Sequence, residues 1–137
     1  SLDYTFSKCC NPIPGDPIFG FVTINEGVKV HKKTCPNAIS MQSNYAYRVI
    51  PAKWVKSDER DFKVSLRISG IDRDGLISDI SKVILDSKFV KLTNINIDTE
   101  GNVFNGKVSI SINNNATLKK LMLDIKNVKG VDKVTRL

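Results

Sequence analysis

The chain of 137 residues is 41% hydrophobic, and its aliphatic runs fall far short of the roughly 20 residues that a membrane helix needs, so we expect a water-soluble globular protein of one or two small domains. Three cysteines are too few for a disulfide scaffold, and neither a secretion signal nor an initiator methionine is present, which favours a reducing, cytoplasmic setting and a piece of a longer protein. A net charge of +7, from 21 basic and 14 acidic residues, favours a polyanionic partner, with an ordinary solvated basic face as the alternative.

Residues 1–55 are predicted to form a small β-rich module that contains all three cysteines and the only histidine. Cys9 and Cys10 open a turn rich in proline and glycine. His31 and Cys35 are four residues apart, at a corner between a strand and a helix. The elements expected here are a strand over 18–24, a turn at 25–27, a strand over 28–31 and a short helix over 36–41.

A charged linker is predicted at residues 56–61, because only one of these six residues is uncharged and the composition changes across them. Residues 62–137 contain neither cysteine nor proline, and their periodicity gives the order βαββαβ. A switch of apolar parity predicts a bulge near Thr93 and Asn94. The elements expected in this module are a strand around Val64 to Ile68, a helix from Leu76 to Ile84 capped by Asp72 or Asp74, a strand from Val90 to Asp98, a turn at 100–102, a strand around Val108 to Ile112, a helix from Leu118 to Ile125 capped by Asn115 or Thr117, and a strand from Val131 to Leu137 after Gly130.

This order predicts an α+β, ferredoxin-like domain, in which a four-stranded antiparallel sheet carries both helices on one face. The other face is expected to be open, polar and basic. It has no aromatic side chains for stacking bases of single-stranded RNA, so phosphate contact is the nucleic-acid role left open to it. The residues expected on this face are Lys63, Ser65, Arg67, Lys107, Ser109 and Ser111.

Three thiols and one imidazole form a donor set suited to tetrahedral Zn²⁺, provided that the hairpin brings His31 and Cys35 back to Cys9 and Cys10. A structural zinc ion would also help a module of about 55 residues, which is near the lower limit for a self-sufficient core. Adjacent cysteines are awkward as joint ligands because neighbouring side chains tend to diverge. Binding by three ligands and no metal at all therefore stay open.

The same four residues have other interpretations. Packing and hydrogen bonding without a metal explain the cluster about as well. Thiol redox sensing is less favoured, since a disulfide between Cys9 and Cys10 would be strained. A nucleophilic Cys/His dyad lacks an orienting third group and an oxyanion site, and no glycine-rich phosphate loop is present, so the sequence predicts no catalytic apparatus.

The loop from Gly70 to Leu76 is a second candidate site, because it joins a strand to a helix. Amides at a helix N-terminus can hold a carboxylate, Gly75 permits close backbone approach, and Asp72 can take an ammonium group, which together suit an amino-acid ligand. The simpler interpretation is a capped turn with Arg73 in solvent.

Five stretches of the chain form recognisable motifs: Lys8 to Asp16, Gly20 to Thr23, Gly27 to His31, Thr34 to Ala38, and Asp72 to Leu76. Together they resemble the C-terminal regulatory end of RelA/SpoT-type proteins, the (p)ppGpp synthetases and hydrolases of the bacterial stringent response. The first four resemble that family's conserved-cysteine module, also called its zinc-finger or ribosome-intersubunit module. The last resembles the D-R-x-G-L turn of an ACT domain, whose βαββαβ fold agrees with the predicted order.

This resemblance implies regulation rather than catalysis, because the hydrolase and synthetase domains of the family lie upstream of these two modules. It also implies that the parent chain is a GTP pyrophosphokinase. In that family both modules contact large-subunit ribosomal RNA, so starvation would be sensed at the ribosome and transmitted to the catalytic domains. An amino-acid-sensing ACT module and a structural dimerisation module, through a homodimer of ACT domains, are the alternatives. The candidates for RNA phosphate contacts are Lys8, Lys29, Lys32, Lys33 and Arg48, and those for an amino-acid or dimer surface are Asp72, Arg73, Gly75, Leu76 and Ile77.

Overall fold

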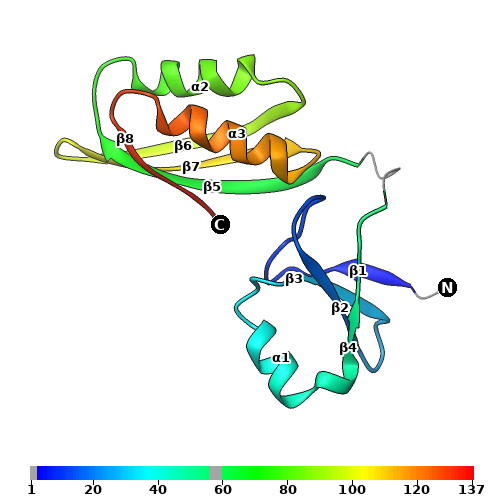
Figure 1. Ribbon diagram of the computed structural model, residues 1–137. Coiled ribbons are helices and arrows are strands. Elements are labelled where there is room, and N and C mark those ends of the chain that lie inside the picture. The colour runs from blue at the N-terminus through cyan, green and yellow to red at the C-terminus, as the bar shows by residue number, and fades with distance from the viewer. Residues whose placement is uncertain (1–2, 56–59) are drawn as a thin grey trace. The chain divides into compact units, whose positions relative to one another are not determined.

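The computed structural model describes residues 3–55 and 60–137, which form two compact units (Figure 1). The division falls after Asp58, so unit 1 comprises residues 1–58 and unit 2 comprises residues 59–137. Positions 56–59 of the charged linker predicted from the sequence lie outside the described residues. In the described parts of both units, no helix has the length and apolar character needed to cross a membrane.

Unit 1 is built on a four-stranded sheet with the strand order β1-β3-β2-β4. The strand β1 runs parallel to β3, whereas β2 is antiparallel to both β3 and β4. The elements, in chain order, are β1 (Tyr4–Phe6), β2 (Ile18–Val22), β3 (Val28–Lys32), α1 (Ala38–Asn44), the 3-10 helix η1 (Ala46–Arg48) and β4 (Val49–Pro51).

The sequence predicts the hairpin of β2 and β3 but misses the two outer strands, β1 and β4. The strand β2 ends at Val22, earlier than expected, because the hydroxyl of Thr23 donates to the carbonyl of Gly27 at 2.6 Å and closes the turn. The helix α1 begins at Ala38 rather than at Pro36, since the residues before Ala38 form a turn. The predicted short helix is therefore present but shifted along the chain.

A cluster of buried side chains joins the sheet of unit 1 to α1. Phe19 and Phe21 of β2 pack with Ala38 at the start of α1, and Cys10 and Cys35 belong to the same cluster. Two of the three thiols are thus part of the core of this small unit. Their low exposure to solvent results from packing in this core.

Unit 2 has the predicted βαββαβ order, and its sheet has the strand order β6-β7-β5-β8 with every pairing antiparallel. Both helices cover one face of this sheet, as expected (Figure 1). This arrangement confirms the predicted fold class. The bounds are β5 (Phe62–Ile71), α2 (Leu76–Asp86), β6 (Val90–Glu100), β7 (Val103–Ile112), α3 (Asn115–Lys126) and β8 (Val131–Arg136).

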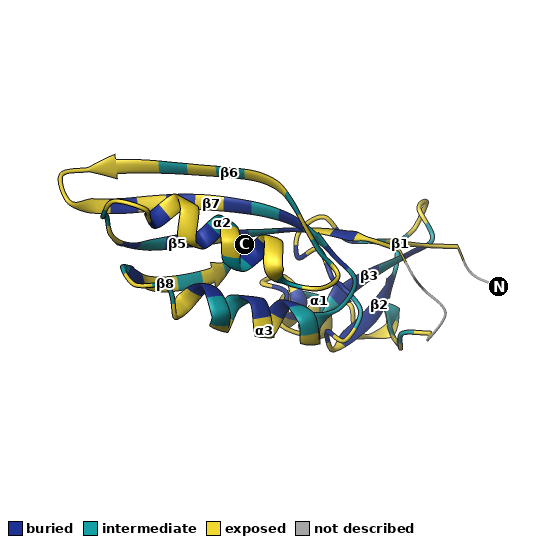
Figure 2. Ribbon diagram, turned by 90° about the horizontal axis from the view of Figure 1, so that it is seen from above, coloured by how far each residue is buried: buried dark blue, intermediate teal, exposed yellow. Residues whose placement is uncertain are grey.

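Alternation along the strands separates the two faces of this sheet. In β5, Val64, Leu66 and Ile68 are buried against the helices, while the residues between them are half-buried or exposed (Figure 2). The register between β6 and β7 shifts between Leu92 and Asn94, which confirms the predicted bulge. The bulge lets the apolar side chains on both sides of it reach the same face.

The start of α2 differs from the prediction. Its N-cap is Gly75, which has φ of +80° and offers no side-chain hydrogen bond to the helix, so neither Asp72 nor Asp74 is the cap. The left-handed backbone at this position favours glycine, which has no Cβ to clash. The chain therefore enters α2 through a backbone turn that a search for capping side chains does not detect.

The start of α3 lies close to the predicted position. Asn114 is the N-cap, and its side-chain oxygen accepts a hydrogen bond from the backbone amide of Thr117 at 2.8 Å. The predicted caps, Asn115 and Thr117, were therefore wrong, although both lie shortly after the true cap in the sequence. Thr117 contributes its amide to the cap and not its hydroxyl.

The face of the sheet away from the helices carries the expected polar residues. Arg67 pairs with Lys107 across β5 and β7, and both are exposed. Ser65 pairs with Ser109, and their hydroxyls lie 3.2 Å apart. The exposed Lys63 pairs with the half-buried Ser111, which completes the set named from the sequence.

Candidate metal centre

A tight turn after β1 positions Cys9 and Cys10. The amide of Ser7 donates to the carbonyl of Val30 at 2.9 Å, which ties the start of the turn to β3. The amide of Asn11 donates to the carbonyl of Ser7 at 2.9 Å, and Asn11 has φ of +48°, a left-handed conformation that asparagine tolerates better than most residues. The chain reverses here, so both cysteines face β3.

The other two residues of the cluster come from β3 and from the loop that follows it. His31 is buried near the end of β3, where its ring stacks on Phe19 with centroids 5.5 Å apart. The amide of Cys35 donates to the carbonyl of Lys32, and the carbonyl of Cys35 accepts from Ala38, both at 2.9 Å. These two bonds fold the segment before α1 back over the end of β3.

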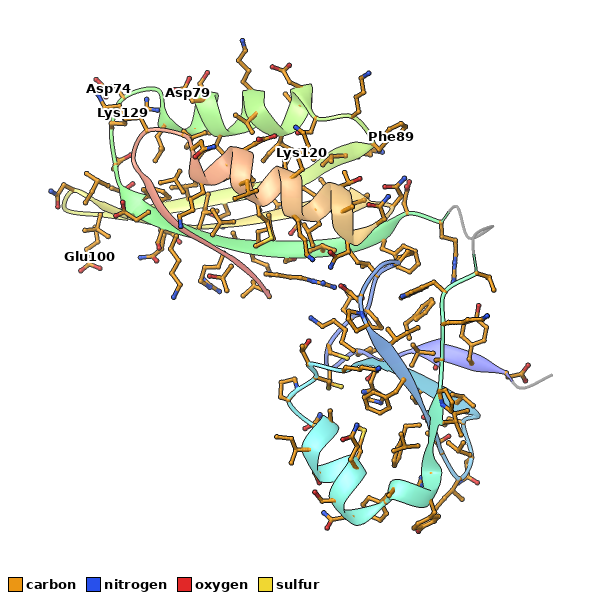
Figure 3. The ribbon with its side chains drawn as sticks, in the orientation of Figure 1. Asp74, Asp79, Phe89, Glu100, Lys120 and Lys129 are labelled. Atoms are coloured by element: carbon orange, nitrogen blue, oxygen red, sulfur yellow. The ribbon has the colours of Figure 1, made fainter. Side chains whose placement is uncertain are left out.

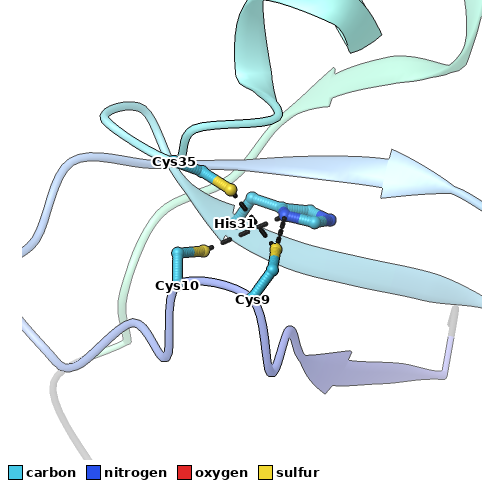
Figure 4. A group of neighbouring side chains, drawn as sticks. All are labelled: Cys9, Cys10, His31 and Cys35. Atoms are coloured by element: carbon cyan, nitrogen blue, oxygen red, sulfur yellow. Dashed lines mark hydrogen bonds between the residues drawn. The ribbon is translucent and has the colours of Figure 1, made fainter. Parts of the chain in front are cut away.

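The four side chains converge on one point (Figure 4). The Sγ atom of Cys9 lies 3.3 Å from Sγ of Cys35 and 3.4 Å from Nδ1 of His31, and Sγ of Cys10 lies 3.9 Å from the same nitrogen. All four candidate ligand atoms are within 4.8 Å of one another. The expectation that the adjacent cysteines diverge was wrong, because the turn at residues 8–10 directs both thiols inward.

This donor set fits a tetrahedral Zn²⁺ ion. Zinc bonds to thiolate sulfur are about 2.3 Å long, which places neighbouring sulfur ligands roughly 3.8 Å apart. The Cys9–Cys35 sulfur separation of 3.3 Å is roughly half an ångström shorter than that value, and all four ligand atoms lie within 4.8 Å of one another, so the cluster has the dimensions of such a site. Three thiols and an imidazole are also the soft and borderline donors that zinc prefers over the hard cations Mg²⁺ and Ca²⁺.

Burial and hydrogen bonding give the three thiols different acidities. Burial raises the pKa of Cys10 to about 12, and it also raises the pKa of Cys35. At Cys9 burial acts in the same direction, but hydrogen bonds from neighbouring side chains outweigh it and lower the pKa. Burial, with the positive charge of Lys29, lowers the pKa of His31, so the ring is neutral at pH 7, the form that binds a metal.

These shifts predict that unit 1 without metal is most stable between about pH 6.5 and pH 9, the ordinary pKa values of histidine and cysteine. As the pH falls below this window, the unfolded chain takes up a proton at His31 that the folded chain resists, so the free energy of unfolding decreases. As the pH rises above it, the unfolded chain loses protons that folded Cys10 and Cys35 retain, and the free energy of unfolding decreases again.

Urea unfolding of the metal-free chain at pH values below, within and above this window tests the expectation. The fluorescence of Trp54, the only tryptophan, reports on unit 1, where its indole nitrogen donates to the carbonyl of Asp16 at 2.9 Å. His31→Gln should flatten the acid side of the profile and leave the alkaline side in place. Equal stability of the unsubstituted chain on both sides of pH 6.5 would contradict the assignment of His31 as a buried neutral group.

Sequence reasoning missed three groups that support the cluster. The hydroxyl of Ser7 lies 3.0 Å from Sγ of Cys9, and the amide of Lys32 donates to Sγ of Cys10 at 3.3 Å. Phe21 meets the His31 ring edge-on at a centroid distance of 6.4 Å. The alternation of Phe19 and Phe21 with Gly20 was a signal for an aromatic wall, whereas nothing in the spacing identified Ser7.

The five candidates for RNA phosphate contact have different environments. Lys8 and Lys33 are exposed, and Lys32 is half-buried. The other two already have partners within unit 1: the ammonium of Lys29 lies 3.3 Å from a carboxylate oxygen of Glu26, and the guanidinium of Arg48 donates to the carbonyl of Val22 at 2.8 Å. Arg48 also lies over the ring of Phe21 at 4.6 Å.

In the loop before α2, Arg73 is held by the protein and does not extend into solvent. Its Nε donates to the carbonyl of Lys129 at 2.7 Å, and its Nη2 pairs with a carboxylate oxygen of Asp79 at 2.7 Å. A third bond goes to the carbonyl of Asp74 at 3.0 Å. Asp74, Asp79 and Lys129 accordingly lie together at one end of unit 2 (Figure 3).

Of the other residues proposed for an amino-acid or dimer surface, one is buried in the core and three are at least partly exposed. Leu76 is only 1% exposed and belongs to the core, so it cannot contact a ligand directly. Gly75 and Ile77 are exposed, and Asp72 is half-buried with its amide bonded to the carbonyl of Asn102 at 2.8 Å. An amino-acid ligand or a second copy at these three residues stays a prediction.

The fold and the cluster together define a class: a small cysteine-histidine module followed by a βαββαβ domain. An ACT domain family model matches residues 58–136, and a RelA/SpoT RIS domain model matches residues 1–55. The chain belongs to the RelA/SpoT family and is the C-terminal regulatory region that combines these two domains.

Curated relatives extend the same similarity over nearly the whole chain. The bifunctional (p)ppGpp synthase/hydrolase RelA of Mycobacterium tuberculosis is 36% identical over 96% of this chain, which spans 18% of that protein. A GTP pyrophosphokinase of Haemophilus influenzae is 28% identical over 100% of this chain and 19% of its own length. The chain therefore covers less than a fifth of these relatives.

A solved structure supports the assignment of unit 2. The ACT domain from the GTP pyrophosphokinase of Chlorobium tepidum aligns with a TM-score of 0.52 at 29% identity. The alignment covers 57% of this chain and 100% of that domain. The shared fold thus coincides with the βαββαβ part of the chain.

Proposed function

We propose that the chain is a non-catalytic regulatory part of a (p)ppGpp synthetase/hydrolase, in which unit 1 contacts ribosomal RNA and unit 2 helps to transmit that contact to catalytic domains elsewhere in the longer protein. The observation that carries the proposal is a RIS domain whose four cysteine and histidine side chains meet at one point beside exposed lysines. Relatives named GTP pyrophosphokinase and (p)ppGpp synthase/hydrolase support the activity of the parent protein. A cytoplasmic location follows from this function.

The cluster of unit 1 would hold a structural zinc ion through Cys9, Cys10, His31 and Cys35. When bound, the ion supplies four metal–ligand bonds that connect the turn at residues 8–10 to β3 and to the segment before α1. Four protein ligands leave no open coordination position for water or substrate, which is the arrangement of structural zinc and not of catalytic zinc. The proposal therefore gives the metal a folding role.

Formation of the cluster also determines where the basic side chains lie. Lys8 belongs to the same turn as Cys9, and Lys32 and Lys33 directly follow His31. Convergence of the four side chains consequently places these three lysines beside the cluster, in the turn at residues 8–10 and at the end of β3 with the turn that follows it. Phosphate groups of RNA are the matching partner, because neutralising them releases condensed counterions and gives salt-dependent affinity.

The test is ribosome binding of the chain as a function of salt, with the double variant K32E/K33E. We expect weaker binding and a decrease of roughly 1.4 to 1.8 in the slope of log Kobs against log salt, since each of the two phosphate contacts contributes roughly 0.7 to 0.9. A matched control is K82E/K119E, which makes the same change in net charge at exposed positions of α2 and α3. An unchanged slope for K32E/K33E, or an equal loss in the control, would exclude these lysines as a specific phosphate surface.

A further inference from the structure

Among the three thiols, Cys9 is the exposed one, whereas Cys10 and Cys35 are only 8% and 4% exposed. A small oxidant in solution therefore reaches Cys9 first. The thiol in contact with Cys9 is that of Cys35, at a sulfur–sulfur distance of 3.3 Å (Figure 4). The two residues are 26 positions apart in the sequence, which is why spacing alone could not pair them.

The surroundings select Cys35 over Cys10 as the partner of Cys9. Cys10 is adjacent to Cys9 in the chain, where a disulfide is strained, and its sulfur accepts a hydrogen bond from the amide of Lys32 at 3.3 Å. Cys9 and Cys35 both lie in turns, outside the strands and α1. A shift of little more than 1 Å brings their sulfur atoms to the bonding distance of about 2.05 Å.

We propose that Cys9 and Cys35 are a reversible oxidation site, in which a peroxide converts the two thiols to a disulfide. Peroxide first oxidises the Cys9 thiol to a sulfenic acid, and one molecule of water leaves. The sulfur of Cys35 then attacks the sulfur of Cys9, forming the S–S bond and releasing a second molecule of water. The two thiols together lose two electrons and two protons, and one peroxide is reduced to two waters. A dithiol or a small thiol reverses the step by exchange.

This modification competes with metal binding, a consequence that rests on the proposed zinc site. The disulfide removes two of the four ligands and leaves Cys10 and His31, which are too few for a structural zinc site. Peroxide would therefore exchange the metal for a covalent link between the same two turns. Oxidation and zinc release are expected in equal amounts.

The first experiment uses the reduced, metal-free chain with one equivalent of hydrogen peroxide. We expect the free thiols to fall from three to one per chain, and mass spectrometry of non-reduced peptides to identify the link between Cys9 and Cys35. A link between Cys9 and Cys10, a link between Cys10 and Cys35, or sulfinic acid at Cys9 in place of a disulfide would overturn the proposal. No variant is needed for this result, so a folding defect cannot obscure it.

Two variants separate the steps. Cys10→Ser should still form the link, leaving no free thiol, whereas Cys35→Ser should stop at a sulfenic acid on Cys9 that a dimedone probe captures. Failure of Cys10→Ser to form the disulfide while it remains folded by circular dichroism would contradict the assigned pair. Equal capture of sulfenic acid in the unsubstituted chain would show that Cys35 does not resolve it.

A zinc-loaded sample distinguishes this proposal from that of the metal site. One zinc released per disulfide formed, measured with a metal indicator, supports both. A chain that binds no zinc but still forms the link would disprove the zinc site and leave the oxidation site intact. A chain that keeps its zinc and its three thiols under peroxide, and forms no link when metal-free, would overturn the oxidation site alone.

Discussion

Chelation of zinc is expected to lower the free energy of unfolding of unit 1 strongly and to leave that of unit 2 unchanged. The core of unit 1 is small, and two members of its main cluster, Cys10 and Cys35, are themselves candidate metal ligands. Structural zinc contributes about 10–16 kcal/mol of binding free energy in zinc-finger peptides. A core of this size rarely supplies more than about 3–5 kcal/mol by itself, so the ion would provide most of the stability of unit 1.

The two units can be followed separately in one sample. Trp54 stacks on Phe6 at a centroid distance of 5.3 Å, so its fluorescence follows unit 1, while α2 and α3 contribute most of the helical circular dichroism and follow unit 2. At a urea concentration that leaves the zinc-loaded chain folded, chelator should shift the Trp54 emission to that of exposed indole and leave the helical signal in place. Cys35→Ser should behave like the chelated chain, whereas Lys53→Ser, an exposed position of unit 1, should behave like the zinc-loaded chain. An unchanged Trp54 spectrum after complete zinc removal would contradict a structural role for the metal.

The fold of unit 2 was predictable because its elements are long and their patterns are local. Ten residues of β5 and ten of β7 alternate between core and surface, and α2 buries Leu76, Ile80 and Ile84 at helical spacing. Even the bulge at Leu92 to Asn94 left a signal, the change of apolar parity. Each of these features can be detected within a short window of sequence.

The outer strands of unit 1 could not be predicted in the same way. β1 (Tyr4–Phe6) and β4 (Val49–Pro51) have three residues each, too few to establish a period. The parallel pairing of β1 with β3 also depends on residues far apart in the chain. Gly75 shows the same limit at the start of α2, because the conformation of the backbone, and not a capping side chain, begins the helix.

At the candidate metal centre, the sequence predicted the four residues that the structure brings together but not their geometry. Residue type alone marks three cysteines and one histidine as candidate ligands. Their convergence depends on the left-handed backbone of Asn11 and on the bond from Ser7 to Val30, which turn both thiols toward β3. The contact between Cys9 and Cys35, on which the oxidation site rests, is a product of the same tertiary arrangement.

Gly70→Ala is expected to destabilise unit 2 by about 3 kcal/mol or more, one of the largest effects available from adding a single methyl group. A Cβ at Gly70 would overlap the carbonyl oxygen of Gly130 and lie 2.9 Å from the amide of Asp132, and both are backbone atoms that cannot rotate away. The same Gly130 carbonyl accepts a hydrogen bond from the amide of Ile71 at 2.8 Å. The clash would therefore also break this hydrogen bond at the end of β5, where the loop before α2 begins.

Gly101→Ala is the matched control, because its Cβ would meet nothing within 4 Å and only its φ of +63° disfavours alanine. That strain should cost about 1 kcal/mol. Urea unfolding followed by circular dichroism gives both values, and amide chemical shifts at residues 71–77 should move in Gly70→Ala but not in Gly101→Ala. Equal losses in the two variants would mean that β5 and β8 separate easily at Gly70. The loop that Arg73 ties to Lys129 would then lack the rigid support on which any binding role at Asp72, Gly75 and Ile77 depends.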